Sequence, residues 1–303
     1  MIKSLTITNH LGDSIKLELT RPALSGFIVK SIEGLGQVKA NVNMTDLAMY
    51  DGSRYNSSYL QRRDIVMNLG FLQSATESIE DIRHKSYKYF PTKKKIQILI
   101  ETDKRLLKTE GVVETNEPDI FSSEEGCSIT ISCPDPYLYS PKENEYVFSG
   151  VQPTFEFPFE NESLTEPLLE MGVLVNNTDK MVFYGGDADV GVKIYIHAIG
   201  DASNLTIYNI GTGEQMGIDS AKLITLTGSD IIEGDTITID TVRGSKSVTL
   251  LRKGEKINIL NCLTRESDWF TLCQGDNVFA YRSEIGSTNL QFRITNKIVY
   301  SGV

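Results

Sequence analysis

The sequence predicts a mainly β protein of two domains, and three observations lead to this expectation. The chain has 303 residues, and at roughly 150 residues per domain this length suggests two domains. Apolar and polar residues alternate in many short runs, which is the period of a half-buried strand. The segment 134–141 carries three prolines in eight residues, and proline interrupts strand ladders. We therefore expect one domain over 1–140 and a second over 141–303.

The first domain is predicted to be a β-sheet that carries one helix. Ser74 and Glu77 form a capping-box pattern, and Pro91 ends the helical spacing, so we expect the helix over about 75–89. A lone helix with a narrow apolar stripe needs a flat partner, which a sheet provides. The alternating runs that predict the strands are Leu5–Ile7, Ile15–Leu19, Val38–Met44, Ile65–Leu69, Ile96–Ile100 and Ile129–Ile131.

The second domain is predicted to be a β-sandwich. From about Val190 onward, alternating runs recur with Gly, Asp and Asn between them, as in sandwich folds. The runs are Val192–Ile196, Leu205–Ile207, Leu223–Thr227, Ile237–Ile239, Val248–Leu250, Val278–Ala280 and Leu290–Ile294. The preceding segment, 142–189, reads as an insertion. Its part 152–174 is either a long edge-strand hairpin or a mobile insertion.

Charge and composition exclude several classes of protein. The net charge is −10, which argues against the broad basic face that nucleic-acid binding requires. No stretch approaches the roughly 20 apolar residues of a membrane span. The first residues lack the apolar core of a secretory signal, so we expect synthesis in a cytoplasm without export through the Sec route.

The four cysteines are predicted to be buried, reduced thiols. Cys127 and Cys133 fall on one expected strand, where six residues place them roughly 20 Å apart. A disulfide needs Cα atoms within about 7 Å, so these two cannot bond to each other within the chain. The spacing of Cys262 and Cys273 does not match a zinc site either.

We find no constellation of residues that predicts catalysis, a cofactor or a metal. His10, His84 and His197 fall in a turn, on the helix and in a strand, and none belongs to a motif. Paired carboxylates at 124–125 and at 187 and 189 could in principle cleave a glycoside, but acidic loops are usually solvated. Trp269, the single tryptophan, could stack on a sugar; more often such a residue is a core or interface residue.

Several short segments, in order along nearly the whole chain, resemble the distal tail protein (Dit) family of siphophages and related prophage particles. In the first half they are Leu5–Asn9 with Gly12 and Ile15, Ile32–Leu35, Asp51–Ser53, Arg63–Ile65, the helix followed by Phe90–Pro91, and Ile129–Tyr137. In the second half they are Leu205–Asn209, Gly211–Gly213, Asp235–Thr241, Asp268–Phe270 and Leu272–Asn277. Gln274 stands where the family usually has proline, and the insertion 142–189 is longer than the family pattern.

The resemblance implies an N-terminal belt domain that forms a ring, normally of six copies, and a galectin-like C-terminal β-sandwich. It implies a structural, non-enzymatic hub in the virion tail tip, made in the host cytoplasm, that links the tail tube to the baseplate and host-adhesion apparatus. The implied partners are other copies of the chain, the major tail tube protein, the tail-associated lysin or tape-measure-associated tail protein, and receptor-binding or baseplate proteins. No contact with nucleic acid or membrane is required.

Two alternatives remain open at this point. The chain could be a carbohydrate-binding adhesin module for bacterial cell-surface glycans, in which case Trp269 would lie exposed in a groove. It could also be a glycan-cleaving enzyme, in which case the carboxylates would have to come together.

Overall fold

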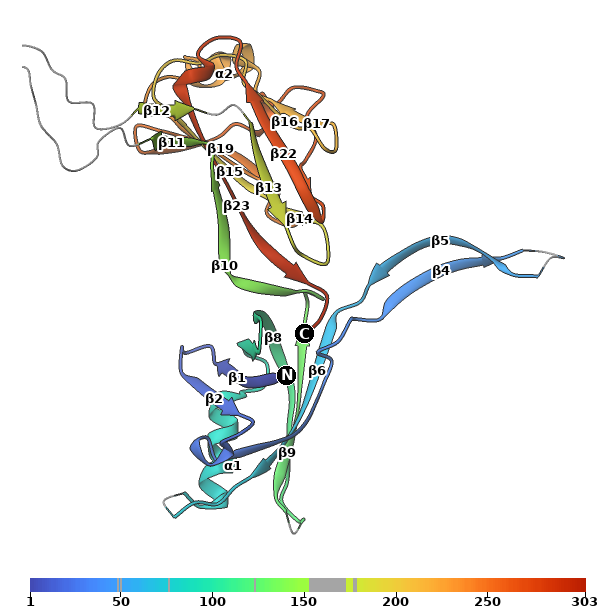
Figure 1. Ribbon diagram of the computed structural model, residues 1–303. Coiled ribbons are helices and arrows are strands. Elements are labelled where there is room, and N and C mark those ends of the chain that lie inside the picture. The colour runs from blue at the N-terminus through green and yellow to red at the C-terminus, as the bar shows by residue number, and fades with distance from the viewer. Residues whose placement is uncertain (48, 50, 76, 123, 153–172, 177–178) are drawn as a thin grey trace, which may run out of the picture. The chain divides into compact units, whose positions relative to one another are not determined.

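The computed structural model describes residues 1–303 except 48, 50, 76, 123, 153–172 and 177–178 (Figure 1). The chain divides into two compact units. Unit 1 comprises Met1–Pro141 and Val299–Val303, and unit 2 comprises Lys142–Ile298. Both units consist mainly of strands, which confirms the predicted fold class. No helix in the described ranges has both the length and the apolar composition that crossing a membrane requires.

Unit 1 is one antiparallel sheet that surrounds a single core. Its strands follow the spatial order β2-β1-β7-β8-β9-β6-β3. All seven place inward side chains in the same core, so the sheet curls around it; we call this curled sheet the barrel of unit 1. The strands are β1 (Ile2–Thr8), β2 (Ser14–Glu18), β3 (Phe27–Glu33), β6 (Arg63–Phe71), β7 (Lys95–Thr102), β8 (Leu106–Asp119) and β9 (Gly126–Cys133); β4 (Ala40–Asp46) and β5 (Ser53–Leu60) form a separate ribbon.

One helix, α1 (Ile79–Tyr89), packs on this sheet as predicted, but it begins later than predicted. Its N-cap is Ser78, whose hydroxyl accepts from the Asp81 N–H while the Asp81 carboxylate accepts from the Ser78 N–H. The expected box fails because the Glu77 carboxylate binds Lys85 instead, at 3.1 Å. Ser74 and Glu77 close only a single turn before the helix.

Unit 2 is a sandwich of two antiparallel sheets. One sheet has the order β23-β15-β18-β19-β20, and the other has the order β13-β22-β16-β17. Tyr281 and Phe292 stack between them, with ring centroids 3.7 Å apart. The elements are β10 (Leu138–Val147, which begins in unit 1), β11 (Ser149–Gln152), β12 (Val173–Asn176), β13 (Asp179–Tyr184), β14 (Val190–Gly191), β15 (Lys193–Ala198), β16 (Thr206–Asn209), β17 (Glu214–Gly217), α2 (Ser220–Thr227), β18 (Thr236–Asp240), β19 (Ser247–Arg252), β20 (Glu255–Asn258), β21 (Thr271–Leu272), β22 (Gly275–Arg282) and β23 (Leu290–Tyr300, which ends in unit 1).

The segment 223–227, which we predicted as a strand, is instead part of the helix α2. Asp219 caps its first turn by accepting from the N–H groups of residues 221 and 222. Gly228 ends it in the left-handed conformation, at φ +83°. The hydroxyls of Thr225 and Thr227 donate hydrogen bonds to the carbonyls four residues earlier. This bonding lets β-branched residues occupy a helix, so their alternation misled the prediction.

Three of the four cysteines are buried, as expected, but Cys273 is exposed, so that prediction was wrong for it. Cys127 and Cys133 do lie on one strand, β9, and all four thiols are free. Burial raises the pKa of the Cys127 thiol to about 12, so it stays protonated. The expected hairpin or insertion at 152–174 falls almost wholly outside the described residues; at its base, β11 pairs with β12.

The last five residues differ from the expected domain division. We assigned them to the second domain, but Val299–Val303 belong to unit 1. Val299 is buried, and the Val303 N–H donates to the Leu35 carbonyl at 3.0 Å. The chain therefore passes between the units twice, after Pro141 and after Ile298.

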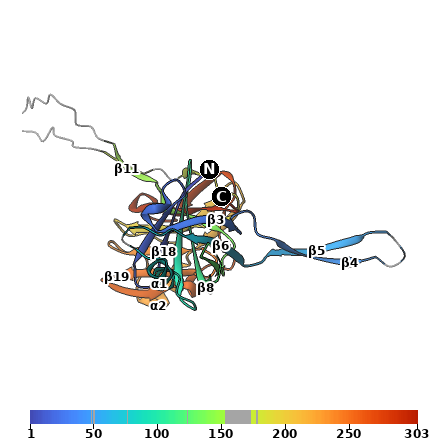
Figure 2. The same ribbon diagram turned by 90° about the horizontal axis from the view of Figure 1, so that it is seen from below.

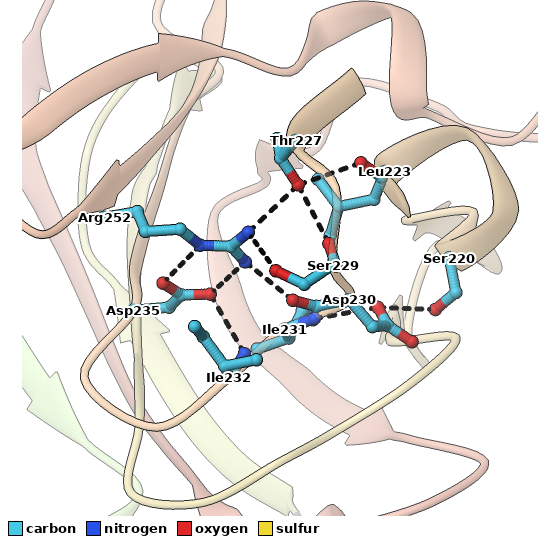
Figure 3. A network of polar contacts seen from close by, with 9 residues as sticks. All are labelled: Ser220, Leu223, Thr227, Ser229, Asp230, Ile231, Ile232, Asp235 and Arg252. Atoms are coloured by element: carbon cyan, nitrogen blue, oxygen red, sulfur yellow. Dashed lines mark hydrogen bonds and ion pairs between the residues drawn. The ribbon is translucent and has the colours of Figure 1, made fainter. Parts of the chain in front are cut away.

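A buried ion pair fixes the loop after α2 in unit 2 (Figure 3). The Arg252 guanidinium donates to both carboxylate oxygens of Asp235, at 2.9 and 2.6 Å. It also donates to Thr227 and Ser229 and to the carbonyl of Asp230. The Asp235 side chain is only 2% exposed; it also accepts from the Ile232 N–H at 3.0 Å, and Arg252 supplies the positive charge that balances it.

We predict that Arg252→Met destabilises unit 2 by about 3–5 kcal/mol, because Asp235 is left buried and unpaired. Differential scanning calorimetry measures the loss. Lys297→Met is the control, since it removes an exposed pair with Glu143 and should cost at most about 1 kcal/mol. Equal losses in the two variants would contradict the prediction.

Candidate assembly surface

The ribbon β4–β5, which we call the arm, projects from the barrel of unit 1 (Figures 1 and 2). Its strands pair from Ala40 with Leu60 to Asp46 with Ser53, with one bulge. Every residue of β5 is exposed, and in β4 only Asn41 is partly covered. In the described part of the chain, neither strand pairs with any other strand. The arm therefore contributes nothing to the core of its own chain.

The two faces of the arm differ in chemistry. Residues directly opposite each other in an antiparallel pair share a face. One face, here called the apolar arm face, consists of Ala40, Val42, Met44, Tyr55 and Leu60, with Ser58 between them and the polar pair Asp46 and Ser53 at its end. The other, here called the polar arm face, consists of Asn41, Asn43, Thr45, Arg54, Ser57 and Tyr59.

Hydrogen bonds across the polar arm face fix its side chains. The Asn41 amide donates to the Tyr59 hydroxyl at 2.7 Å, and the Asn43 amide donates to the Ser57 hydroxyl at 3.0 Å. Such pairs stabilise a ribbon and are compatible with contact to water. These side chains of the polar arm face therefore have hydrogen-bond partners within the arm itself.

The apolar arm face is uncovered. Met44 is 60% exposed and Tyr55 is 58% exposed, on a ribbon that has two unpaired edges. A two-stranded hairpin alone is at best marginally stable in water, and an open edge can add a further strand. Covering the apolar face and pairing the edges would both stabilise the arm. An exposed apolar face and open strand edges are the features that an interface with another chain would use.

The structure does not unite the three histidines in one site. His10 is exposed in the turn after β1, and His84 is exposed on α1, where its ring lies 3.8 Å from the Glu80 carboxylate. His197 lies in the other unit and contacts the Thr236 hydroxyl at 3.1 Å. No group of three or more His, Cys, Asp or Glu is placed to hold a metal within the described ranges.

The carboxylates and the tryptophan are likewise dispersed. Glu124 pairs with Lys30 and Glu125 pairs with Arg83, both in unit 1, whereas positions 187 and 189 are in unit 2. Trp269 is half-buried, and the Lys246 ammonium lies 5.1 Å from its ring centroid. A cation over the ring occupies a surface that a sugar would need. Sugar binding by Trp269 stays a prediction.

Family comparison accounts for both units. Residues 14–150 match the phage tail protein RIFT-related domain, and residues 185–296 match the C-terminal domain of the siphovirus-type tail component. The chain belongs to the Dit family. A Dit protein is a structural component of the phage tail hub rather than an enzyme. The first match includes the whole arm, and the second covers most of the sandwich.

A solved structure of a phage tail protein shares the fold. The Dit protein (gp 19.1) of phage SPP1, described as a paradigm of the hub adsorption apparatus in phages that infect Gram-positive bacteria, is 13% identical; the match has a TM-score of 0.63 and covers 98% of this chain and 100% of that one. A chain of the phage P2 baseplate in its activated conformation with Ca is 9% identical, with a TM-score of 0.45 and 98% of each chain covered. None of the curated proteins matches this Dit chain.

Sequence reasoning missed the two faces of the arm. Val38–Met44 was recognised as an alternating run, but alternation alone does not say whether the apolar side meets the core of its own chain. The signal was in β5, whose sequence SRYNSSYL is too polar to cover a core. A strand of that composition, paired with an alternating one across Asp51-Gly52, indicates a free ribbon.

We predict that unit 1 of this Dit protein folds without its arm. The Gln61 N–H lies 3.4 Å from the Lys39 carbonyl, so a short Gly-Ser link can replace residues 40–60. The free energy of unfolding should change by no more than about 1 kcal/mol, because no core contact is lost. Chemical denaturation measures this. A loss comparable to that of a core truncation would show that the arm does support the barrel.

Proposed function

We propose that this Dit protein is the ring-forming hub subunit at the distal end of a siphophage tail. Membership of the family supports the role, and the uncovered apolar arm face is the observation that carries the mechanism. A surface that its own chain leaves open, on an element outside the core, is suited to a neighbouring copy. We further propose six copies per ring, a number taken from the family resemblance.

The ring would be built by a head-to-tail contact. Such a contact joins two different surfaces and closes when the rotation between neighbours divides a full turn. The arm supplies one of the surfaces, since it reaches away from its own barrel. Its open edges allow main-chain pairing with the neighbour, and its apolar face supplies the burial that stabilises the pairing. The polar arm face remains in contact with water.

The remaining partners follow from the position of a hub. We propose that the ring contacts the major tail tube protein on one side and, on the other, the tail-associated lysin or tape-measure-associated tail protein and the receptor-binding or baseplate proteins. We also propose that unit 1 forms the belt and that the galectin-like unit 2 carries the outward contacts. The protein would be made in the host cytoplasm and act at the virion tail tip.

No step of this function requires bond making or breaking. The dispersed histidines and carboxylates are consistent with a protein that acts by fitting against its neighbours. We therefore propose that the protein acts without catalysis and without a cofactor.

We predict that Val42→Glu raises the dissociation constant of the ring by about 10- to 100-fold, because a charge would be buried at the subunit contact. Sedimentation velocity over a concentration series measures the constant, and negative-stain microscopy counts the copies. Asn43→Glu is a matched control, being the next residue on the same strand and on the polar arm face. Equal effects at the two positions, or a wild-type protein that stays monomeric, would contradict the proposal.

A further inference from the structure

A buried arginine at the base of the arm donates through its guanidinium to main-chain carbonyls. Arg63 is 1% exposed, and its guanidinium donates four hydrogen bonds to carbonyl oxygens. The acceptors are Gly34 at 2.6 Å, Gly36 at 2.7 Å, Pro136 at 2.9 Å and Ser301 at 2.7 Å. Burial lowers the pKa of the guanidinium, but an arginine remains charged in proteins. Four carbonyl dipoles compensate for its lost hydration.

The acceptors come from three separate segments of chain. Gly34 and Gly36 lie in the stretch that enters the arm, while Arg63 begins β6, just after the chain leaves the arm. Pro136 lies shortly before the first passage of the chain to unit 2, and Ser301 lies shortly after the return. One side chain thus joins the entry and exit of the arm to both of the connecting segments.

The C-terminal tail, defined here as residues 301–303, packs against the entry segment, which is residues 34–39 leading into the arm. The Val303 N–H donates to the Leu35 carbonyl at 3.0 Å. A Cβ added at Gly302 would lie 3.1 Å from the Gly36 carbonyl carbon, so the two main chains are in direct contact. A Cβ at Gly34 would overlap the Asp64 carbonyl, so the entry segment also lies directly against β6. The entry segment is therefore held between β6 and the tail.

The direction of the arm depends on this base, because among the described residues the arm has no contact with the core. Seven residues of β4 span about 23 Å at about 3.3 Å per residue. A rotation of about 10° at the base would therefore move the tip by about 4 Å. A displacement of that size exceeds a hydrogen-bond length and would misplace strand pairing with a neighbour.

We propose that Arg63 and the C-terminal tail act together as a clasp that positions the arm for assembly. The proposal rests on the proposed function of the arm. Arg63 is a positioning residue, since it acts through the main chain of the entry segment. Lysine cannot replace it, because a single ammonium does not present donors in the planar, forked arrangement that reaches four carbonyls. With the clasp open, the barrel stays folded while the arm loses its fixed direction.

Hydrogen exchange of the full chain tests the clasp, with three variants. Arg63→Met removes the donor, and deletion of residues 301–303 removes the Ser301 acceptor and the Val303 bond while keeping Val299 and Tyr300 in place. Arg62→Met is the matched control, because its neighbouring side chain is 59% exposed. We expect amides of residues 34–39 and 61–63 to exchange about tenfold faster or more in the first two variants, with β7 unchanged.

Two further results complete the test. The double variant should exchange no faster than Arg63→Met alone within about twofold, because both changes open one clasp. Ring formation should weaken in Arg63→Met and in the tail deletion, and it should be unchanged in Arg62→Met. If Arg63→Met fails to fold, the tail deletion, which leaves the core intact, decides the outcome.

Exchange at wild-type rates in a folded tail-deletion variant would overturn the clasp. Faster exchange with unchanged ring formation would overturn its role in assembly. If the wild-type protein forms no ring, the proposed function fails, while the exchange rates still show whether Arg63 and the tail hold the arm base.

Discussion

The arrangement of unit 1 depends on a ribbon, the arm, that packs against no other described part of its own chain. A two-stranded hairpin normally gains stability from a third strand or a packed face, and the arm has neither. Its polar face compensates locally, through amide and hydroxyl pairs such as Asn41 with Tyr59. Its apolar face also carries a hydroxyl pair, Tyr55 with Ser58, but its apolar side chains stay exposed to water. In the proposed ring, contact with a neighbouring copy would cover them. Stability and assembly are therefore coupled in this one element.

A second consequence concerns the barrel, which must be rigid where the arm leaves it. The core of unit 1 draws on every strand of its sheet and on α1, which gives a firm base. The arm adds no residue to that core, so its surface can vary without cost to folding. This separation allows the apolar arm face to be shaped by the needs of a neighbour, whereas inward positions such as Ile98 are constrained by packing.

The sequence predicted those parts in which local pattern and tertiary environment agree. Strands β6, β7 and β9 alternate because one side meets the core, and their positions were recognised from that pattern. The pattern failed at α2, where threonine hydroxyls bond to the helix carbonyls, and at the start of α1, where Lys85 takes the carboxylate of Glu77. It could not reveal Arg63, since the burial of a charge depends on carbonyls that are distant in sequence, at positions 34, 136 and 301.

The two buried arginines show why Arg63 serves to position main chain. Arg252 is bound bidentately by the Asp235 carboxylate, so its charge is neutralised by one side chain. Its other donors bind the loop 227–230. Arg63 has four carbonyl acceptors, each of which belongs to a rigid peptide unit. Arg252 thus holds one loop beside its carboxylate partner, whereas Arg63 fixes the main chain of three segments that are distant in sequence. The second arrangement suits a joint from which a long ribbon must leave in a defined direction.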